Sequence, residues 1–268
     1  MVSGNNIPQT QYSFGALTSM PLNRTGMDVF DYQTRPLVPQ DKNRHLSSLQ
    51  ESLLIKLFPD KFVSKYASKD FLEKAVKSNP RIAQLLKSQG LDVRIEPENV
   101  TEITQSHLIP TMKYAREIMD NMGDNYSLQD YYAMDQAALL HDIGKAFIPS
   151  EILNKKGKLT QKERDIIELH NDLGYEVLRC TGLSPKVLSL VKNHHDYNKT
   201  GDRDDLSQIL SVADVYSALK ENRAYKTSMS DNESFKILRD KSSSGEFDAA
   251  FVKALQQSQG YKVQATVA

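Results

Sequence analysis

Apolar residues recur at spacings of three and four along most of the chain after about residue 47, the spacing of one face of an α-helix. Strictly alternating apolar and polar positions, the mark of a half-buried strand, are nearly absent. The apolar stripes run through 49–57, 71–76, 112–122, 134–141, 166–173, 187–194 and 206–218. The pattern predicts an all-α fold, a bundle of helices that bury these stripes against one another.

Polar residues with capping spacing precede several of these stripes and predict where helices begin. Ser and Thr followed three residues later by an acidic residue form capping boxes, and Pro is favoured at the first helical position. The pairs are Ser127 with Asp130, Thr160 with Glu163 and Ser230 with Glu233, and the proline starts are Asn79-Pro80 and Ser184-Pro185. The helix that begins at Ser127 is expected to continue through His141 and to stop at Gly144.

The character of the sequence changes along the chain and predicts four segments. Residues 1–45 are rich in Pro, Gly, Asn and Thr without a sustained period, which predicts an extended or disordered arm. Residues 46–99 predict a small helical subdomain, 100–260 the main helical domain, and 261–268 a tail. The first 96 residues are a candidate sensory or partner-docking element, including a contact between two copies in a homodimer.

Composition narrows the classes of function. The 268 residues contain 34 Lys and Arg and 34 Asp and Glu, so the zero net charge argues against binding to nucleic-acid polymers or membranes. A single cysteine, Cys180, excludes an internal disulfide and suits a reducing compartment. No apolar run reaches the length of a membrane span, and the first residues lack the features of a secretory signal. We therefore expect a cytoplasmic protein.

Histidines and aspartates continue the apolar stripes of several predicted helices. They are His107, His141-Asp142, His170, His194-His195 and Asp214. Burying so many imidazoles and carboxylates is unfavourable unless a partner satisfies them. Helix bundles build two-metal sites from such side chains on facing helices, and a set without a thiolate cluster suits Fe, Mn, Zn, Co or Ni. The pattern predicts a metal centre, and Gly174, one turn after His170, leaves room for close packing.

Each of these residues also has a simpler interpretation by itself. His141-Asp142 can cap a helix, His170 can be a hydrogen-bonded core histidine, and His194-His195 can interact with a helix dipole. A buried Asp214 can pair with Arg223. These interpretations would have to hold independently on four or five helices, so together they are less economical than one metal centre.

The motifs around these residues resemble the HD-GYP branch of the HD superfamily of metal-dependent phosphohydrolases. The resemblance covers about residues 100–258, with its motifs in order. They are HDIGKAFIPSEILNKKGKLTQKERDIIELHNDLGYEVL from 141, NHH at 193–195, ILSVADVYSALKENRAYK at 209–226 and EFDAAFVKAL from 246. It implies an all-α phosphodiesterase with cyclic di-GMP as the best-known substrate, acting by a two-metal hydroxide mechanism.

Carried over residue by residue, the resemblance implies a role for each motif position. His107, His141, Asp142 and Asp214 would hold one metal, and Asp142 would bridge to a second metal held by His170, His194 and His195. Asp142 and Lys145 would be catalytic, with Lys145 facing a substrate phosphate. Arg223 and Lys226 match the family's basic pair that grips substrate phosphates.

Three departures from the family pattern bear on substrate and metal number. The GYP signature is missing, and the chain reads DYNKTGDRDDLSQIL after His195, so the substrate can be cyclic di-GMP, another cyclic dinucleotide or a mononucleotide. Ile103 replaces the Glu that supplies a third metal in some members, with Glu102 beside it, which favours two metals, Fe or Mn first. Pro110 should start or kink the helix after His107. A signalling or binding module without turnover is the alternative from another class.

Overall fold

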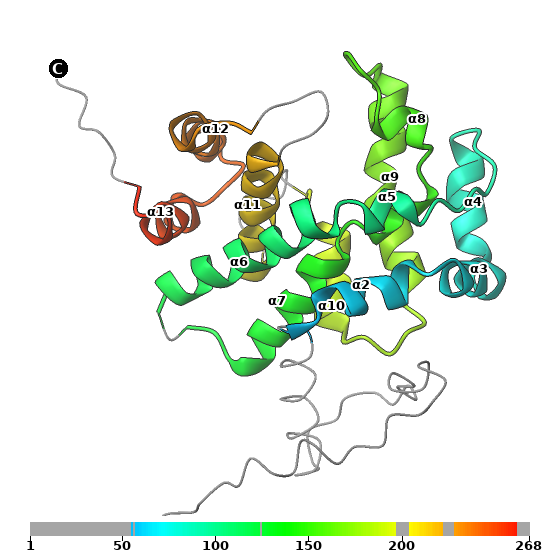
Figure 1. Ribbon diagram of the computed structural model, residues 1–268, viewed down its shortest axis with the longest axis horizontal. Helices are drawn as coiled ribbons and strands as arrows, with labels where there is room; N and C mark the ends of the chain where they lie inside the picture. The colour runs from blue at the N-terminus through cyan, green and yellow to red at the C-terminus, as the bar shows by residue number, and fades with distance from the viewer. Residues whose placement is uncertain (1–54, 56, 124, 197–203, 222–227, 262–268) are drawn as a thin grey trace, which may run out of the picture. The chain divides into compact units, whose positions relative to one another are not determined.

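The computed structural model describes residues 55, 57–123, 125–196, 204–221 and 228–261, and all of its regular structure within these ranges is helical (Figure 1). These residues belong to one compact unit. The predicted all-α fold is therefore confirmed for the described part of the chain. The arm at 1–45, the residues Arg223 and Lys226, and all of the predicted tail but Tyr261 lie outside the described residues.

The helices follow one another with short connections. In chain order they are α2 (Pro59–Ala67), α3 (Lys69–Ser78), α4 (Pro80–Ser88), α5 (Glu98–Thr101), the π-helical turn η3 (Thr104–Leu108), α6 (Ile109–Asn121), α7 (Leu128–Leu140), the 3-10 turn η4 (Ile143–Phe147), α8 (Ser150–Leu153), α9 (Gln161–Leu178), α10 (Pro185–Asn193), α11 (Asp205–Lys220), α12 (Asp231–Ser243) and α13 (Ala249–Ser258). None of the described helices is both long and apolar enough to cross a membrane.

The predicted helix starts agree with the structure, and one predicted helix end does not. The capping boxes at Ser127, Thr160 and Ser230 form with both of their reciprocal hydrogen bonds. The predicted stop at Gly144 is wrong, because α7 ends at Leu140 and a 3-10 turn then runs from Ile143 to Phe147 through the glycine. This change of helix type turns the chain directly after the His141-Asp142 pair.

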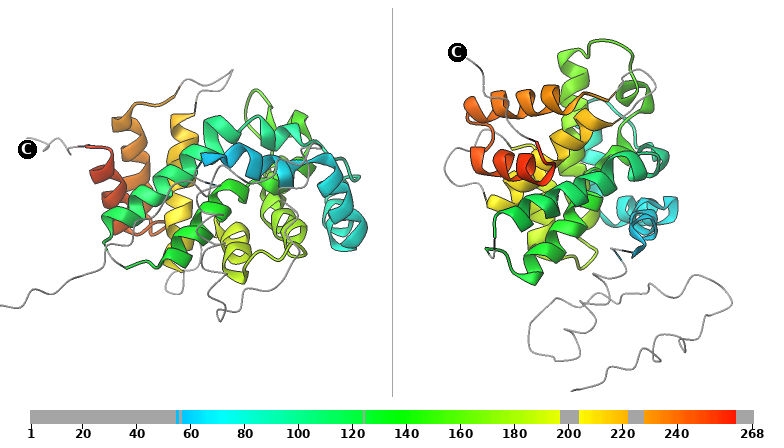
Figure 2. Two further views of the ribbon diagram at one scale, coloured as in Figure 1. Left: turned by 60° about the horizontal axis from the view of Figure 1, so that its bottom comes forward. Right: turned by 60° about the vertical axis from the view of Figure 1, so that its left-hand side comes forward.

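The apolar core lies between α6, α7, α9, α10 and α11. α6 packs on α7, α11 and α13, α10 packs on α7 and α9, and α9 packs on the η4 turn. Figure 2 shows α12 and α13 beside α11 and α6, on the side of the unit away from α3 and α4. Fully buried side chains such as Met119, Met134 and Leu210 fill the centre, so the faces that the stripes predicted do meet.

Helices α2 to α4, which fall within the predicted subdomain at 46–99, contribute to the same apolar core. Val63, Leu72 and Ile82 are fully buried in it. Asn79 caps α4 and donates its side-chain amide to the carbonyl oxygen of Glu176 in α9, 2.9 Å away. The division of the chain at residues 45 and 99 stays a prediction.

Candidate metal centre

Five separate segments bring the seven predicted ligand residues to one place. His141 and Asp142 follow the last turn of α7, and Asp214 lies in the middle of α11. The four other histidines come from η3, α9 and the end of α10. In the described part of the chain, three overlapping groups offer ligand atoms within 4.8 Å of one another. The groups are His170–His194–His195, His107–His141–Asp214 and His141–Asp142–His194.

The close approach of η4 to α9 brings Asp142 beside His170, and Gly144 makes this approach possible. A Cβ atom on Gly144 would lie 2.0 Å from the carbonyl oxygen of His170 and 2.7 Å from the backbone nitrogen of Gly174. Only a residue without a side chain fits there. As a result, Asp142 Oδ1 lies 3.4 Å from His170 Nε2.

Two buried serines of α11 hold the backbone at two of the candidate histidines. Ser211 donates its hydroxyl hydrogen bond toward the carbonyl oxygen of His194, and Ser217 donates to that of His107 at 3.0 Å. They lie three residues before and three residues after Asp214, on the same face of the helix. The face of α11 that carries the carboxylate therefore also fixes the ends of two neighbouring segments.

His107 lies in a π-helical turn, where the backbone amide of Leu108 bonds to the carbonyl oxygen of Ile103, 3.1 Å away. Such wide turns are frequent at functional sites. Pro110, which lacks an N–H, then occupies the start of α6, as predicted. The turn directs His107 inward, with Nε2 3.0 Å from Asp214 Oδ1, whereas the neighbouring Glu102 is exposed.

The carboxylate of Asp142 faces two sets of imidazoles at once. Its Oδ2 atom lies 3.5 Å from His107 Nε2 and 3.4 Å from His141 Nε2, while its Oδ1 atom faces His170. Asp142 Oδ1 and His141 Nε2 are buried without a hydrogen-bond partner. An acidic group whose two oxygens point to two different sets of nitrogens is suited to bridging a pair of cations.

The hydrogen bonds of three histidines fix which ring nitrogen carries the proton. The Nδ1 atoms of His141, His170 and His194 lie 2.8, 2.6 and 2.7 Å from the carbonyl oxygens of Ala138, Ile167 and Val191, respectively. A carbonyl oxygen can only accept, so each Nδ1 donates, which leaves each Nε2 directed at the centre. Histidines that bind metals are held in this way by their other ring nitrogen.

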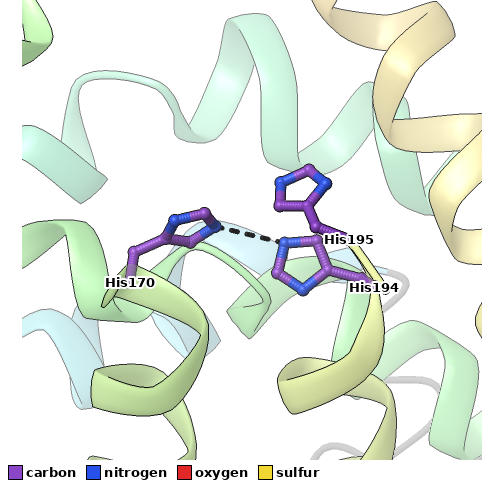
Figure 3. A group of neighbouring side chains, drawn as sticks. All are labelled: His170, His194 and His195. Atoms are coloured by element: carbon purple, nitrogen blue, oxygen red, sulfur yellow. Dashed lines mark hydrogen bonds between the residues drawn. The ribbon is translucent and has the colours of Figure 1, made fainter. Parts of the chain in front are cut away.

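Two of these Nε2 atoms face each other. His170 Nε2 and His194 Nε2 are 3.3 Å apart, with His195 beside them (Figure 3). Two acceptors at this distance repel unless a proton or a cation lies between them. Burial lowers the pKa of His170 to about 3 and holds the pKa of His194 well below its ordinary value, so a shared proton is unfavourable. The arrangement fits a bound divalent cation.

The charges in the centre are strongly coupled. Burial alone would raise the pKa of Asp142, but Lys145 and the surrounding histidines hold it well below its usual range. Burial likewise opposes ionisation of Asp214, and His107 keeps the pKa of that carboxyl well below normal. Burial would lower the pKa of His107, yet Asp142 and Asp214 raise it to about 9. Two buried carboxylates without a metal thus retain a proton on His107.

Lys145 lies at the rim of the centre and is partly exposed. Its Nζ atom is 2.6 Å from Asp142 Oδ2, one turn back in the same segment. The predicted phosphate contacts of Arg223 and Lys226 fall outside the described residues and stay a prediction. Sequence reasoning missed Ser211 and Ser217 entirely and used Gly144 only as a helix stop. The sequence signal that could have indicated these two serines is their position on the same helical face as the candidate ligand Asp214.

Comparison with known proteins identifies the family. A family model described as HD domain matches residues 67–251, and the chain belongs to the HD domain family. It is 34% identical over 172 residues to the 3'3'-cGAMP-specific phosphodiesterase 1 of Vibrio cholerae, a match covering 60% of this chain and 39% of that protein. It is 35% identical over 133 residues to a cyclic di-GMP phosphodiesterase of Pseudomonas aeruginosa, covering 44% and 32%.

Among solved structures, the L. monocytogenes phosphodiesterase PgpH HD domain in complex with cyclic di-AMP is 16% identical, with a TM-score of 0.45. This similarity covers 69% of the present chain and 99% of the other. The chain spans well under half the length of the two curated relatives named above. The predicted resemblance to HD-superfamily phosphohydrolases is thus confirmed at the level of the family.

Proposed function

We propose that this chain is a metal-dependent phosphodiesterase that hydrolyses a cyclic dinucleotide at the buried centre around Asp142. The observation that carries the proposal is the position of the Asp142 carboxylate, whose two oxygens face two different sets of imidazole nitrogens. The facing Nε2 atoms of His170 and His194 support it, because a cation satisfies both of their lone pairs.

In this proposal the centre would hold two divalent ions. His107, His141, Asp142 and Asp214 would hold one of them, and Asp142, His170, His194 and His195 would hold the other. A mixed set of imidazoles and carboxylates suits Fe or Mn, and also Zn, Co or Ni. Glu102 is exposed and Ile103 offers no ligand atom, which supports two ions rather than three.

The chemistry needs no covalent contribution from the protein. When bound, a pair of divalent ions lowers the pKa of water and offsets negative charge on a phosphoryl group. Asp142 sets the distance between the two halves of the centre. The Lys145 ammonium group lies within reach of a phosphate placed over Asp142, where it offsets charge in the transition state or gives a proton to the leaving oxygen.

The names of the relatives support a cyclic dinucleotide as the substrate class. Relatives from Vibrio cholerae and Pseudomonas aeruginosa are named for 3'3'-cGAMP and for cyclic di-GMP. This chain lacks the GYP signature that the HD-GYP branch carries after the position of His194-His195. We therefore propose the cyclic dinucleotide class and leave the choice of bases to experiment.

The test is a substrate screen of the purified protein loaded in turn with Mn and Fe. The panel contains cyclic di-GMP, 3'3'-cGAMP, cyclic di-AMP, mononucleotides and bis-p-nitrophenyl phosphate. Asp142→Asn keeps the shape of the side chain but removes its charge, and Asp70→Asn, at an exposed position of α3, is the matched control. We expect hydrolysis of at least one cyclic dinucleotide, lost in Asp142→Asn and kept in Asp70→Asn. Tight metal binding without turnover of any panel member would instead indicate a binding module.

A further inference from the structure

The η4 turn that carries Lys145 is held from outside by the segment at 96–99. The backbone amide of Glu96 donates to the carbonyl oxygen of Ala146 at 2.8 Å. The side-chain amide of Asn99 donates to the carbonyl oxygens of Lys145, at 3.2 Å, and Ile148, at 2.8 Å. Three of the four carbonyl groups between Lys145 and Ile148 are thus bonded by one short segment that lies over 40 residues earlier in the chain.

The side chain of Asn99 is itself fixed in place. The Ser150 hydroxyl group lies between two acceptors, Asn99 Oδ1 at 2.8 Å and the Glu96 carboxylate, and its single hydrogen serves either of them. The Glu96 carboxylate also accepts the Ser150 backbone amide at 3.0 Å. Burial raises the pKa of Glu96, but the hydrogen bonds from Ser150, Arg94 and Asn99 lower it below its ordinary value, so the carboxylate is charged at neutral pH. Both ends of the Asn99 carboxamide therefore have partners.

The turn depends on this external support. Within the turn, the amide of Lys145 bonds to the carbonyl of Asp142 at 2.9 Å, and the amide of Ile148 bonds to the carbonyl of Lys145 at 3.0 Å. The bonds within a short 3-10 turn have poor geometry, and the last carbonyls of a helical segment need partners from elsewhere. Lys145 lies inside the turn and Asp142 lies just before it, so a shift of the turn moves the lysine relative to the carboxylate.

We propose that Asn99 is a positioning residue for the reaction, which acts through the η4 turn by fixing Lys145 above Asp142. The proposal rests on the proposed function for its kinetic consequence, though not for the structural one. Asn99 does not touch the centre itself. Its carboxamide holds the carbonyl of the residue whose Nζ atom lies 2.6 Å from Asp142 Oδ2. A displacement of about 1 Å at such a position costs on the order of 100-fold in rate.

The chain offers a matched control for a purely structural effect. Asn79 is buried to the same extent as Asn99, with 8% and 9% of the residue surface exposed. Its amide also joins distant segments, because it donates to the backbone carbonyl of Glu176 at 2.9 Å and to the carboxylate of Glu176 at 2.7 Å. These contacts connect α4 to α9 and do not involve the η4 turn. Removing either amide removes comparable hydrogen bonds between distant segments, and Asn79→Ala additionally removes the cap of α4.

The experiment compares Asn99→Ala with Asn79→Ala by three measurements. Hydrogen exchange of the metal-free protein reports the amides of 143–148, metal content reports the centre, and steady-state kinetics separate kcat from KM. We expect exchange in the turn to be at least about tenfold faster in Asn99→Ala only, since one set of bonds is lost. We also expect kcat to fall by about 10- to 100-fold in Asn99→Ala, with metal content and KM changed less than about threefold.

A double-mutant cycle tests whether the effect runs through Lys145. In a Lys145→Ala background, Asn99→Ala should lower kcat by less than about threefold, because the group it positions is already absent. An equal loss in both backgrounds would overturn the proposal. So would unchanged exchange and kcat in Asn99→Ala alongside a stability loss equal to that of Asn79→Ala.

Two further outcomes remain interpretable. If Asn99→Ala does not fold, Ser150→Ala replaces it, because this variant releases Asn99 Oδ1 while the carbonyls keep their partners. We then expect kcat to fall by about twofold to tenfold, on the order of one weakened hydrogen bond. No change in either turn exchange or kcat would overturn the proposal. If the wild-type protein turns over no substrate, the proposed function fails. The exchange measurement then still decides whether Asn99 holds the turn.

Discussion

Replacing Gly144 with alanine is the sharpest single perturbation of the proposed centre. The new Cβ atom would lie 2.0 Å from the carbonyl oxygen of His170 and 2.8 Å from its carbonyl carbon. Both atoms belong to the backbone of α9, which no side-chain rotation can move. The η4 turn and α9 must therefore separate. Asp142 directly precedes the turn and His170 lies in α9, with Asp142 Oδ1 and His170 Nε2 3.4 Å apart.

The size of the effect follows from this geometry. An ordinary contact begins at 3.4 Å, so the separation must grow by about 1 Å or more, while metal–ligand distances tolerate only about 0.2 Å. Overpacking of this kind costs about 1–3 kcal/mol of stability. A reacting group misplaced by about 1 Å costs on the order of 100-fold in rate. We expect Gly144→Ala to fold, to bind close to one equivalent of metal in place of two, and to lose at least about 99% of its activity.

Gly174→Ala is the matched control, because it adds a methyl group to the facing side of the same approach. Its Cβ atom would meet a side-chain carbon of Val191 at 3.2 Å and one of Ile143 at 3.4 Å, and flexible side chains can give way there. Alanine also favours the helix interior by about 1 kcal/mol over glycine, so this variant should stay near wild type. The assays are metal content after dialysis, thermal unfolding and phosphodiesterase rate. Wild-type metal content and rate in Gly144→Ala would refute the reasoning.

Three further predictions concern charge. First, the metal-free protein should be most stable near pH 6.5, which urea unfolding at pH 4–9 checks. The raised pKa of His107, about 9, contributes stability that is full below pH 6.5 and lost as the pH rises through 9, and the lowered pKa of His170, about 3, causes a loss of stability as the pH falls below 6.5. A flat stability profile would contradict this prediction. Second, metal binding at pH 8 should release about one proton, from His107, measurable by calorimetry in two buffers of different ionisation enthalpy; no buffer dependence would contradict it. Third, Arg116→Ala should lower the free energy of unfolding by about 3 kcal/mol in chemical unfolding, because it removes both charge-assisted hydrogen bonds to the fully buried Asp135. A loss below about 1 kcal/mol would show that water replaces the guanidinium group.

Local patterns predicted the helices well because the relevant physics is local. A capping box satisfies backbone donors within four residues, so Ser127, Thr160 and Ser230 define helix starts independently of the rest of the fold. The end of α7 was mispredicted because the chain does not leave helical geometry at Gly144 but tightens into a 3-10 turn. The glycine is required there by the crowding against α9, which is a contact between segments that periodicity does not contain.

The candidate ligands were predictable as buried residues of one centre, but their mutual geometry was not. The spacing of His170 and Asp214 places each on the apolar face of its helix, and both are buried. Helical spacing does not say which faces meet, so the pattern predicted a shared metal centre without its geometry. The assignment of each ligand to one of two metals came from the resemblance to a family. Within the described residues the structure brings the seven side chains together, and their role as metal ligands stays a proposal.

The residues that sequence reasoning missed have a common physical character. Ser211, Ser217 and Asn99 bond to backbone carbonyl groups of other segments, and a carbonyl group is present at every position of the chain. The sequence of the segment that supplies the carbonyl group therefore does not indicate the contact. A candidate histidine ligand is recognisable because a histidine is rare in an apolar core. The serine or asparagine that holds the backbone behind it is a common residue, and the carbonyl group that it bonds to could belong to any residue.

The functional unit begins before the first of the recognisable motifs. The family match starts at residue 67, whereas the resemblance of the motifs begins near residue 100, just before the first histidine. Glu96 and Asn99 precede that point, yet they bond to three carbonyl groups of the turn that carries Lys145. A protein shortened to residue 100 would keep every proposed metal ligand and lose these bonds. Ligand residues alone therefore do not delimit this centre, because the segment that fixes its geometry lies outside the motifs that reveal its chemistry.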